Sequence, residues 1–255
     1  MPDSLVLLHG FSGTHRAWDG VIGALDHERY SPPLALDLPG HGQAADAPRP
    51  ITFAGCVEHV LALSPARFTL CGYSLGGRVA LHVALAAPDR VQRLVLVSAS
   101  PGIEDPAVRA ARRESDRALA GELETADYEG FIERWRSQPL FAGEPPDAGG
   151  LARADQRRNR PDALAAVLRG LGAGEMPPLL GRLGELQMPV TLLVGERDEK
   201  YIALARRMAR ELVDVELIVL PGGHGLVFEN PYGVADVLAT PSPSPRGGIR
   251  PQATP

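Results

Sequence analysis

The chain has 255 residues, 44% of them hydrophobic, and a formal net charge of -5, which suits one α/β domain of ordinary size. This charge gives no electrostatic case for a nucleic-acid or an anionic-membrane partner, and no stretch is long and apolar enough to span a bilayer. The two cysteines make no disulfide framework. The sequence starts close to its first predicted strand, without the apolar run of a secretion signal, so we expect a cytoplasmic protein.

The first predicted element is a buried strand at residues 5–8, an uninterrupted apolar run. A His-Gly-Phe turn follows at residues 9–11. On its own, such a turn is an ordinary strand ending. Beside an activated nucleophile it has a second use, because the backbone N–H of Phe11 can stabilise negative charge on a reacting group.

The most informative segment is the pentapeptide Gly-Tyr-Ser-Leu-Gly at residues 72–76. A β-rich run precedes it and a helical run, residues 78–87, follows it. A serine between two glycines on a strand-to-helix turn is a nucleophile elbow, in which the tight turn exposes the hydroxyl. We therefore predict Ser74 as the nucleophile or base, with the amides of Leu75 and Phe11 as the oxyanion hole. The alternative is a turn serine.

Arg78 lies four residues after Ser74 and so on the same face of the predicted helix. The rest of that helix is apolar, as expected for a helix packed on a sheet. A cation in its first turns is costly unless it is paired or faces a cleft. Arg78 is thus either a carboxylate-binding residue beside Ser74 or half of a buried structural ion pair. His82, on the same helix, is interpreted as a packed side chain.

Residues 103–183, after a strand at residues 91–98, have helical composition, which predicts a helical cap over the site. Helices are expected at residues 106–123, 128–137, 150–159 and 161–171, with a loop around residues 143–150. The segment is rich in arginine. Most of these arginines are expected on solvated, salt-bridged faces. Guanidinium groups also bind carboxylates well, so such a cap suits a small anionic, polycarboxylate substrate.

Two more buried strands follow the cap. The first ends in Gly-Glu-Arg-Asp and the second in Pro-Gly-Gly-His-Gly. Because parallel strands end at the edge where open α/β sheets bind ligands, Asp198 and His224 are expected to meet Ser74 there. His224 would take the serine proton, and Asp198 would orient the imidazole. Glu196 is the rival carboxylate.

These elements predict an α/β-hydrolase fold with a mostly parallel central sheet flanked by helices. Residues 1–102 and 184–239 would form the core, residues 103–183 the cap, and residues 240–255 a disordered tail rich in Pro, Ser and Gly. No spacing of His, Cys or carboxylates indicates a metal, so we expect neither a metal nor an organic cofactor. The sequence leaves a monomer and a dimer both open.

Several longer stretches resemble one family in particular. They read LHGFSG at residues 8–13, LDLPGHG at 36–42, GYSLGGR at 72–78 and WRSQPLF at 135–141. The first two are general to the α/β-hydrolase superfamily. The last two resemble the 2-succinyl-6-hydroxy-2,4-cyclohexadiene-1-carboxylate synthases of menaquinone biosynthesis. The resemblance spans nearly the whole chain except the Pro-rich tail.

What the resemblance implies is elimination, not hydrolysis. The family removes a ring proton from 2-succinyl-5-enolpyruvyl-6-hydroxy-3-cyclohexene-1-carboxylate and expels pyruvate. By this analogy, Ser74 acts as the base and no acyl-enzyme forms. Tyr73 and Trp135 match aromatic pocket residues of the family, although Trp135 is equally well placed to anchor the cap on the core.

The resemblance also assigns carboxylate-binding arginines. Arg78 and Arg112 match two of them. A third is expected just before the segment that begins at Asn159, where the register leaves Arg157 and Arg158 open and favours Arg157.

Two rival functions remain. The first is a serine hydrolase that cleaves an ester, thioester or carbon–carbon bond in an anionic substrate with the same triad. The second is a non-catalytic binding module on the same fold. The arginines count against the first, and the presence of all three triad residues counts against the second.

Overall fold

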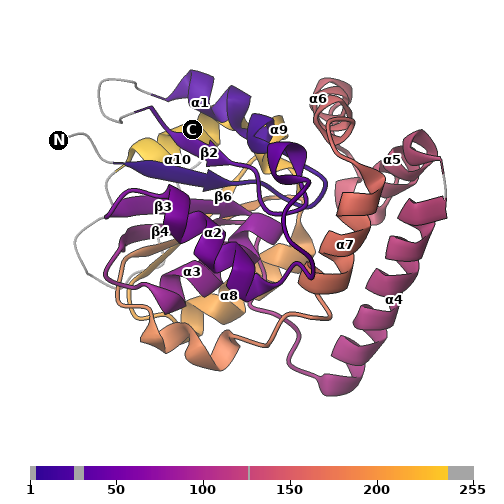
Figure 1. Ribbon diagram of the computed structural model, residues 1–255. Coiled ribbons are helices and arrows are strands. Elements are labelled where there is room, and N and C mark those ends of the chain that lie inside the picture. Colours follow the sequence, from indigo (N-terminus) through magenta and orange to yellow (C-terminus); the bar gives the residue numbers. More distant parts are fainter. Residues whose placement is uncertain (1–3, 26–31, 126, 241–255) are drawn as a thin grey trace.

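The centre of the molecule is a parallel sheet of six strands (Figure 1). The computed structural model describes residues 4–25, 32–125 and 127–240. The strands are β1 (Leu5–Leu8), β2 (Leu34–Leu36), β3 (Phe68–Tyr73), β4 (Val91–Val97), β5 (Val190–Gly195) and β6 (Val215–Leu220). Their order is β2-β1-β3-β4-β5-β6, and every neighbouring pair is parallel.

The inner strands of the sheet are covered on both faces, as parallel strands generally are, which suits their continuous apolar runs. All side chains of β1, β3 and β5 are buried. Since all strands run the same way, the loops that follow them collect at one edge of the sheet. The loops after β1, β3, β5 and β6 therefore bring together the four predicted site segments.

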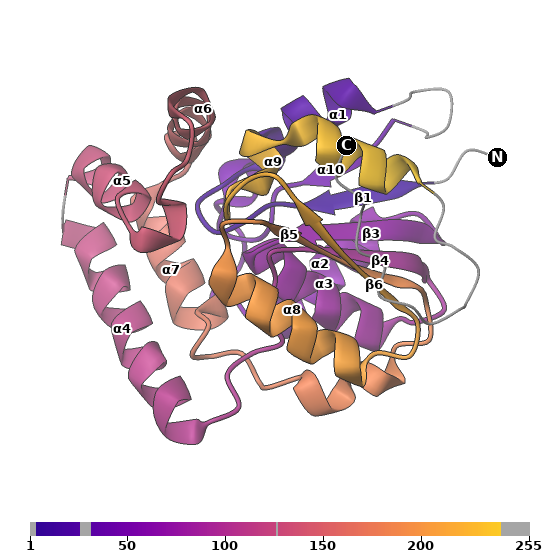
Figure 2. The ribbon, with the colours of Figure 1, turned by 180° about the vertical axis from the view of Figure 1, so that it is seen from behind.

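Helices cover the two faces of the sheet (Figures 1 and 2). One face is covered by α2, α3 and α8, and the other by α1, α9 and α10. These helices are α1 (Asp19–Ala24), α2 (Phe53–Leu63), α3 (Leu75–Ala86), α8 (Glu199–Glu211), α9 (Leu226–Glu229) and α10 (Pro231–Ala239). Helix α3 is the most deeply packed of them, which explains its nearly unbroken apolar sequence.

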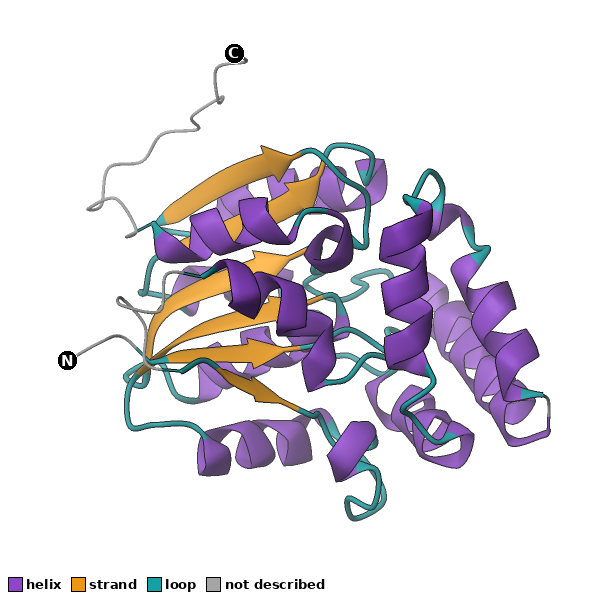
Figure 3. Cartoon of the chain, turned by 90° about the horizontal axis from the view of Figure 1, so that it is seen from above, coloured by secondary structure: helices purple, strands orange, loops and turns teal. Residues whose placement is uncertain are grey.

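Four helices lie beyond the carboxyl ends of the strands, where the arrowheads in Figure 3 point. They are α4 (Pro106–Thr125), α5 (Tyr128–Arg136), α6 (Pro146–Gln156) and α7 (Pro161–Leu171). Helices α4, α5 and α7 share an apolar cluster that includes Phe131, Ile132, Leu164 and Leu168 and is separate from the two clusters of the sheet. Partly buried Phe11, from the loop after β1, packs against both this cluster and one cluster of the sheet.

One predicted boundary is wrong. Helix α6 begins at Pro146, inside the loop expected around residues 143–150. Pro146 occupies the first helical position, where proline has the right φ and no N–H is needed. Gly149 and Gly150 then continue the helix instead of breaking it.

Short 3-10 turns complete the described structure: η1 (His15–Trp18), η2 (Gly42–Ala44), η3 (Pro139–Phe141) and η4 (Leu180–Glu185). Among the residues that the structure describes, no helix is both long enough and apolar enough to cross a membrane. The tail expected at residues 240–255 lies outside the described residues except for Thr240.

The contact between α3 and β1 gives a first prediction. A Cβ at Gly76 would overlap the backbone oxygens of Leu8 and His9, so Gly76→Ala should destabilise the protein by about 1–3 kcal/mol or more. Gly121→Ala in α4 is the matched control, because its Cβ meets nothing within 4 Å and helix propensity then favours alanine by up to about 1 kcal/mol. Urea denaturation measures both, and equal effects would contradict the packing argument.

Candidate active site

The turn at Ser74 has the strained geometry of a nucleophile elbow. Its φ is 52° and ψ is -107°, a left-handed conformation that a serine adopts only where its surroundings enforce it. The Ser74 N–H donates to the carbonyl of Val97 at 2.9 Å. Added side chains at Gly72 and Gly76 would collide with nearby backbone. Strand, helix and turn together hold the Ser74 hydroxyl at the edge of the sheet.

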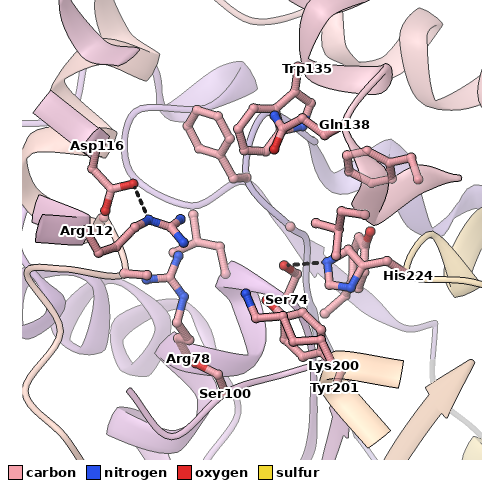
Figure 4. A pocket seen from close by; sticks show the side chains of 18 of the residues that line it. Ser74, Arg78, Ser100, Arg112, Asp116, Trp135, Gln138, Lys200, Tyr201 and His224 are labelled. Atoms are coloured by element: carbon pink, nitrogen blue, oxygen red, sulfur yellow. Dashed lines mark hydrogen bonds and ion pairs between the residues drawn. The ribbon is translucent and has the colours of Figure 1, made fainter. Parts of the chain in front are cut away.

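Ser74, His224 and Asp198 form a hydrogen-bonded chain (Figure 4). The His224 Nε2 is 3.1 Å from the Ser74 Oγ, and its Nδ1 is 2.8 Å from the Asp198 Oδ2. His224 and Asp198 are both buried. Glu196, the rival carboxylate, points to solvent beside Arg197. This geometry suits proton transfer from Ser74 to an imidazole that Asp198 orients.

The two residues expected to supply the oxyanion-hole amides, Phe11 and Leu75, both reach the pocket that Ser74 lines. Leu75 is the first residue of α3, and the N–H groups of a helix's first turn have no partner inside the helix. The turn that contains Phe11 is closed by a hydrogen bond from the Gly13 N–H to the Gly10 carbonyl at 3.1 Å. Phe11, Ser74 and Leu75 all line one pocket. The amides can therefore stabilise negative charge next to the serine.

The pocket is a cavity of about 1310 Å³ between the carboxyl edge of the sheet and helices α4–α7. Its size suits a small metabolite with several polar groups. Tyr73 and Trp135 both line it. The Tyr73 ring lies 5.6 Å from the His224 ring, and the Trp135 ring lies 5.0 Å from the Phe11 ring. Trp135 therefore has both of the roles considered for it. It lines the pocket, and it also packs the cap against the loop after β1.

Arg78 is in the pocket wall without an ion-pair partner among the described residues. Its Nη1 donates to the backbone carbonyl of Leu171 at 2.7 Å. Burial, helped by repulsion from Arg112, lowers the pKa of Arg78 to about 10. The alternative of a buried structural ion pair therefore does not describe this side chain.

Arg112 extends from α4 into the same pocket (Figure 4). Its Nε donates to the Asp116 Oδ1 at 2.8 Å, and Asp116 also accepts the Gly174 N–H at 3.1 Å. Asp116 thus fixes the guanidinium from one side. The two remaining nitrogens of Arg112 stay available on the pocket side, near Arg78.

The structure does not bring Arg157 into the pocket. This residue follows α6, and its guanidinium makes a two-point contact with Glu129 of α5 at 2.9 and 3.0 Å. Arg158 pairs instead with Asp155 at 3.9 Å. Both side chains are exposed, and neither lines the cavity. The expected third arginine is therefore missing from the site.

Most other cap arginines make surface ion pairs, which solvent screens and which contribute little to stability. The pairs are Arg117–Glu114, Arg134–Glu122, Arg153–Glu133, Arg160–Asp162 and Arg169–Glu124. The arginine-rich composition thus mostly reflects the solvated faces of the cap helices. Only the arginines that line the pocket can contribute to binding a ligand there.

Lys200, Tyr201, Ser100 and Gln138 also line the pocket, although sequence reasoning did not single them out. Lys200 and Tyr201 stand two and three residues after Asp198. This spacing puts both residues in the first turn of the helix after β5, at the carboxyl edge of the sheet. It was the feature from which the sequence could have predicted them as site residues. Gln138 lies in the WRSQPLF stretch at residues 135–141 that resembles the family, and that resemblance was the signal for it.

The corner between α6 and α7 fastens the loop that carries Phe11. Asp155 accepts hydrogen bonds from the Thr14 N–H, at 2.8 Å, and from the Thr14 hydroxyl. Asn159 donates to the Ser12 carbonyl at 2.7 Å, and Gln156 donates to the Ser12 hydroxyl at 2.8 Å. These cap residues are buried. They hold the loop, and with it the Phe11 amide, in one position.

Three histidines outside the triad are neutral, of which His9 and His41 are buried and His82 is partly buried. The Leu38 N–H donates to His9 at 3.0 Å, and the Ser12 N–H donates to His41 at 3.3 Å. Burial lowers the pKa of His9 to about 4 and that of His41 well below its usual range. His82 stacks on Phe53 at 4.5 Å, and burial lowers its pKa to about 4. In the described part of the chain, no group of three or more His, Cys, Asp or Glu side chains could hold a metal ion.

Asp155 predicts a pH dependence of stability. Burial raises its pKa to about 6, so the folded protein binds its proton more tightly than the unfolded chain does. The resulting stabilisation is complete below the unfolded value near 3.8 and is lost as the pH rises through about 6. Relative to Asp155→Asn, wild-type stability should therefore fall between pH 4.5 and pH 7.5 in urea denaturation. The buried histidines are common to both proteins and cancel, and a difference that does not change with pH would refute the assignment.

Comparison with known proteins identifies relatives along nearly the whole chain. The Alpha/beta hydrolase family model matches residues 5–237. The 2-succinyl-6-hydroxy-2,4-cyclohexadiene-1-carboxylate synthase of Enterobacter sp. (strain 638) is 34% identical over 242 residues, covering 92% of this chain and 90% of that protein. The synthase of the same name from Salmonella paratyphi C (strain RKS4594) is 35% identical over 240 residues, covering 92% of each chain. The solved structure of MenH from S. aureus superposes with a TM-score of 0.86 at 31% identity, covering 92% of this chain and 91% of that one.

Proposed function

The chain belongs to the 2-succinyl-6-hydroxy-2,4-cyclohexadiene-1-carboxylate synthase family of the α/β hydrolases, and we propose how its residues perform that lyase reaction. The substrate is 2-succinyl-5-enolpyruvyl-6-hydroxy-3-cyclohexene-1-carboxylate, and the products are pyruvate and the conjugated cyclohexadiene. The fold class and the family resemblance expected from the sequence are both confirmed. The observation that carries the proposal is a Ser-His-Asp chain facing a cavity that holds two incompletely neutralised guanidinium groups.

In the proposed mechanism the triad acts as a base. His224 takes the proton of the Ser74 hydroxyl, and Asp198 stabilises the imidazolium. The Ser74 oxygen takes a ring proton, the electron pair of the broken C–H bond forms a new C=C bond, and the ring C–O bond to the enolpyruvyl group breaks. The departing enolate takes the proton from His224 and becomes pyruvate. Ser74 and His224 return to their starting states, and no covalent intermediate forms.

The other site residues bind and stabilise. The amides of Phe11 and Leu75 stabilise the negative charge that develops as the ring proton leaves. Arg78 and Arg112 bind substrate carboxylates, a role that guanidinium groups perform with two parallel hydrogen bonds. Tyr73 and Trp135 supply apolar walls for the ring.

Helices α4–α7 act as the cap predicted at residues 103–183. They shield the reacting groups from water, which strengthens the charge interactions inside the pocket. The substrate-binding role expected for Arg157 is withdrawn, because its guanidinium faces Glu129.

Pyruvate release tests the proposal. The substrate is generated in situ by the preceding enzyme, and pyruvate is followed with lactate dehydrogenase. Ser74→Ala should lower kcat by about 100- to 10,000-fold, as expected for loss of the proton-transferring group. Arg78→Ala should lower kcat/KM by about 30-fold or more, because it leaves a carboxylate unpaired. Arg157→Ala is the matched control and should stay within about twofold of wild type.

The same assay can also refute the proposal. Wild-type release no faster than the uncatalysed background would refute the synthase function. Turnover of p-nitrophenyl esters together with accumulation of an acyl-enzyme would then identify the hydrolase, since the same triad geometry also serves acyl transfer.

A further inference from the structure

Lys200 is the only lysine among the 26 lysine and arginine residues of the chain. Every other basic side chain, whether on the cap, on the sheet or on the surface, is an arginine. A chain that uses arginine at all other positions has no compositional reason to place a lysine at this one. The position of this single lysine is therefore informative.

That position is the wall of the pocket. Lys200 is the second residue of α8, two residues after Asp198, and its amine points into the cavity (Figure 4). No carboxylate of the described residues pairs with it, and its one recorded partner is the Tyr201 ring, 5.6 Å from the Nζ. The side chain is exposed to the solvent of the cavity and is free to bind a ligand there.

The surroundings disfavour a positive charge. The first turn of a helix carries a partial positive charge, which repels a lysine. Burial against the pocket wall, and then the charge of Arg112, lower the pKa of Lys200, although Asp198 raises it. Arg112 also lowers the pKa of Arg78. Arg78, Arg112 and Lys200 thus face one cavity, where only Arg112 of the three has a paired carboxylate, and an anion that enters it relieves the repulsion between them.

We propose that Lys200 is a substrate-binding residue that holds one carboxylate of the substrate. It takes the binding role that the sequence suggested for Arg157. This inference rests on the proposed function and goes further, because it names the third cationic partner. The substrate has a succinyl, a ring and an enolpyruvyl carboxylate. Three other cations that line the cavity, Arg136, Arg197 and Arg207, pair with glutamates, which leaves Arg78, Arg112 and Lys200 to bind these carboxylates. An ammonium group suits this position because it is compact and donates in three directions.

A single lysine permits a direct test that does not need turnover. Reductive methylation with ¹³C-formaldehyde labels Lys200 and, apart from it, only the chain's α-amine. Titration with propane-1,2,3-tricarboxylate should shift the dimethyl-Lys200 resonance saturably and raise the pKa read from its pH titration. Lys200→Met identifies the resonance by removing it. Calorimetry on the unlabelled protein gives the occupancy of the probe independently.

Kinetics supply the second readout. Lys200→Met should raise KM for pyruvate release by about tenfold or more, and Lys200→Arg should recover part of that loss because it keeps the charge. Arg182→Met is the matched control: it removes one positive charge from an exposed pair with Glu185 outside the pocket. It should leave kcat and KM within about twofold of wild type.

The outcomes separate this inference from the proposed function. A resonance that does not move while calorimetry shows bound probe overturns the role of Lys200, as does a probe that fails to bind. A Lys200→Met enzyme with the KM of Arg182→Met also overturns it. If wild type releases no pyruvate, the proposed function fails, and the resonance titration still decides whether Lys200 binds carboxylates.

Discussion

The first turn of α3 lies directly on the end of β1, and the site depends on that close approach. Gly76 is the contact, since any side chain there would meet the backbone oxygens of Leu8 and His9. The register between β1 and β3, in which Leu8 faces Gly72, places the two strand ends level. As a result, the strained turn at Ser74 and the loop that carries Phe11 meet at one point, where a hydroxyl and two amides can act on the same atom.

The cations of the cavity wall above these strand ends differ in how they are paired. The aspartate of the triad is buried behind His224, and three arginines of the wall pair with glutamates: Arg136, Arg197 and Arg207. Asp116 binds one edge of the Arg112 guanidinium, and Arg78 contacts a backbone carbonyl and the Phe53 ring but no carboxylate of the described residues. An anionic substrate completes the hydrogen bonds of Arg78 and Arg112 and offsets the repulsion between the two guanidinium groups.

Sequence patterns correctly predicted those site residues whose positions are set by the strand just before them in the chain. Ser74, Asp198 and His224 each follow a strand, so the common edge of a parallel sheet was enough to predict their meeting. Arg157 failed because its partner, Glu129, lies on another helix, and no local pattern records such a pair. The start of α6 was misplaced because adjacent glycines outweighed the proline that begins it. Asp155 and Asn159 went unnoticed because their partners at Ser12 and Thr14 are far away in sequence.

The central claim is that Ser74 removes a proton from carbon and never bonds to the substrate. A substrate deuterated at the ring carbon that loses its proton tests this most directly. The account predicts slower pyruvate release from the deuterated compound in single-turnover experiments, with no added mass on the intact protein at any time. Equal rates together with a covalent adduct on Ser74 would contradict it, because the triad would then be working as a nucleophile.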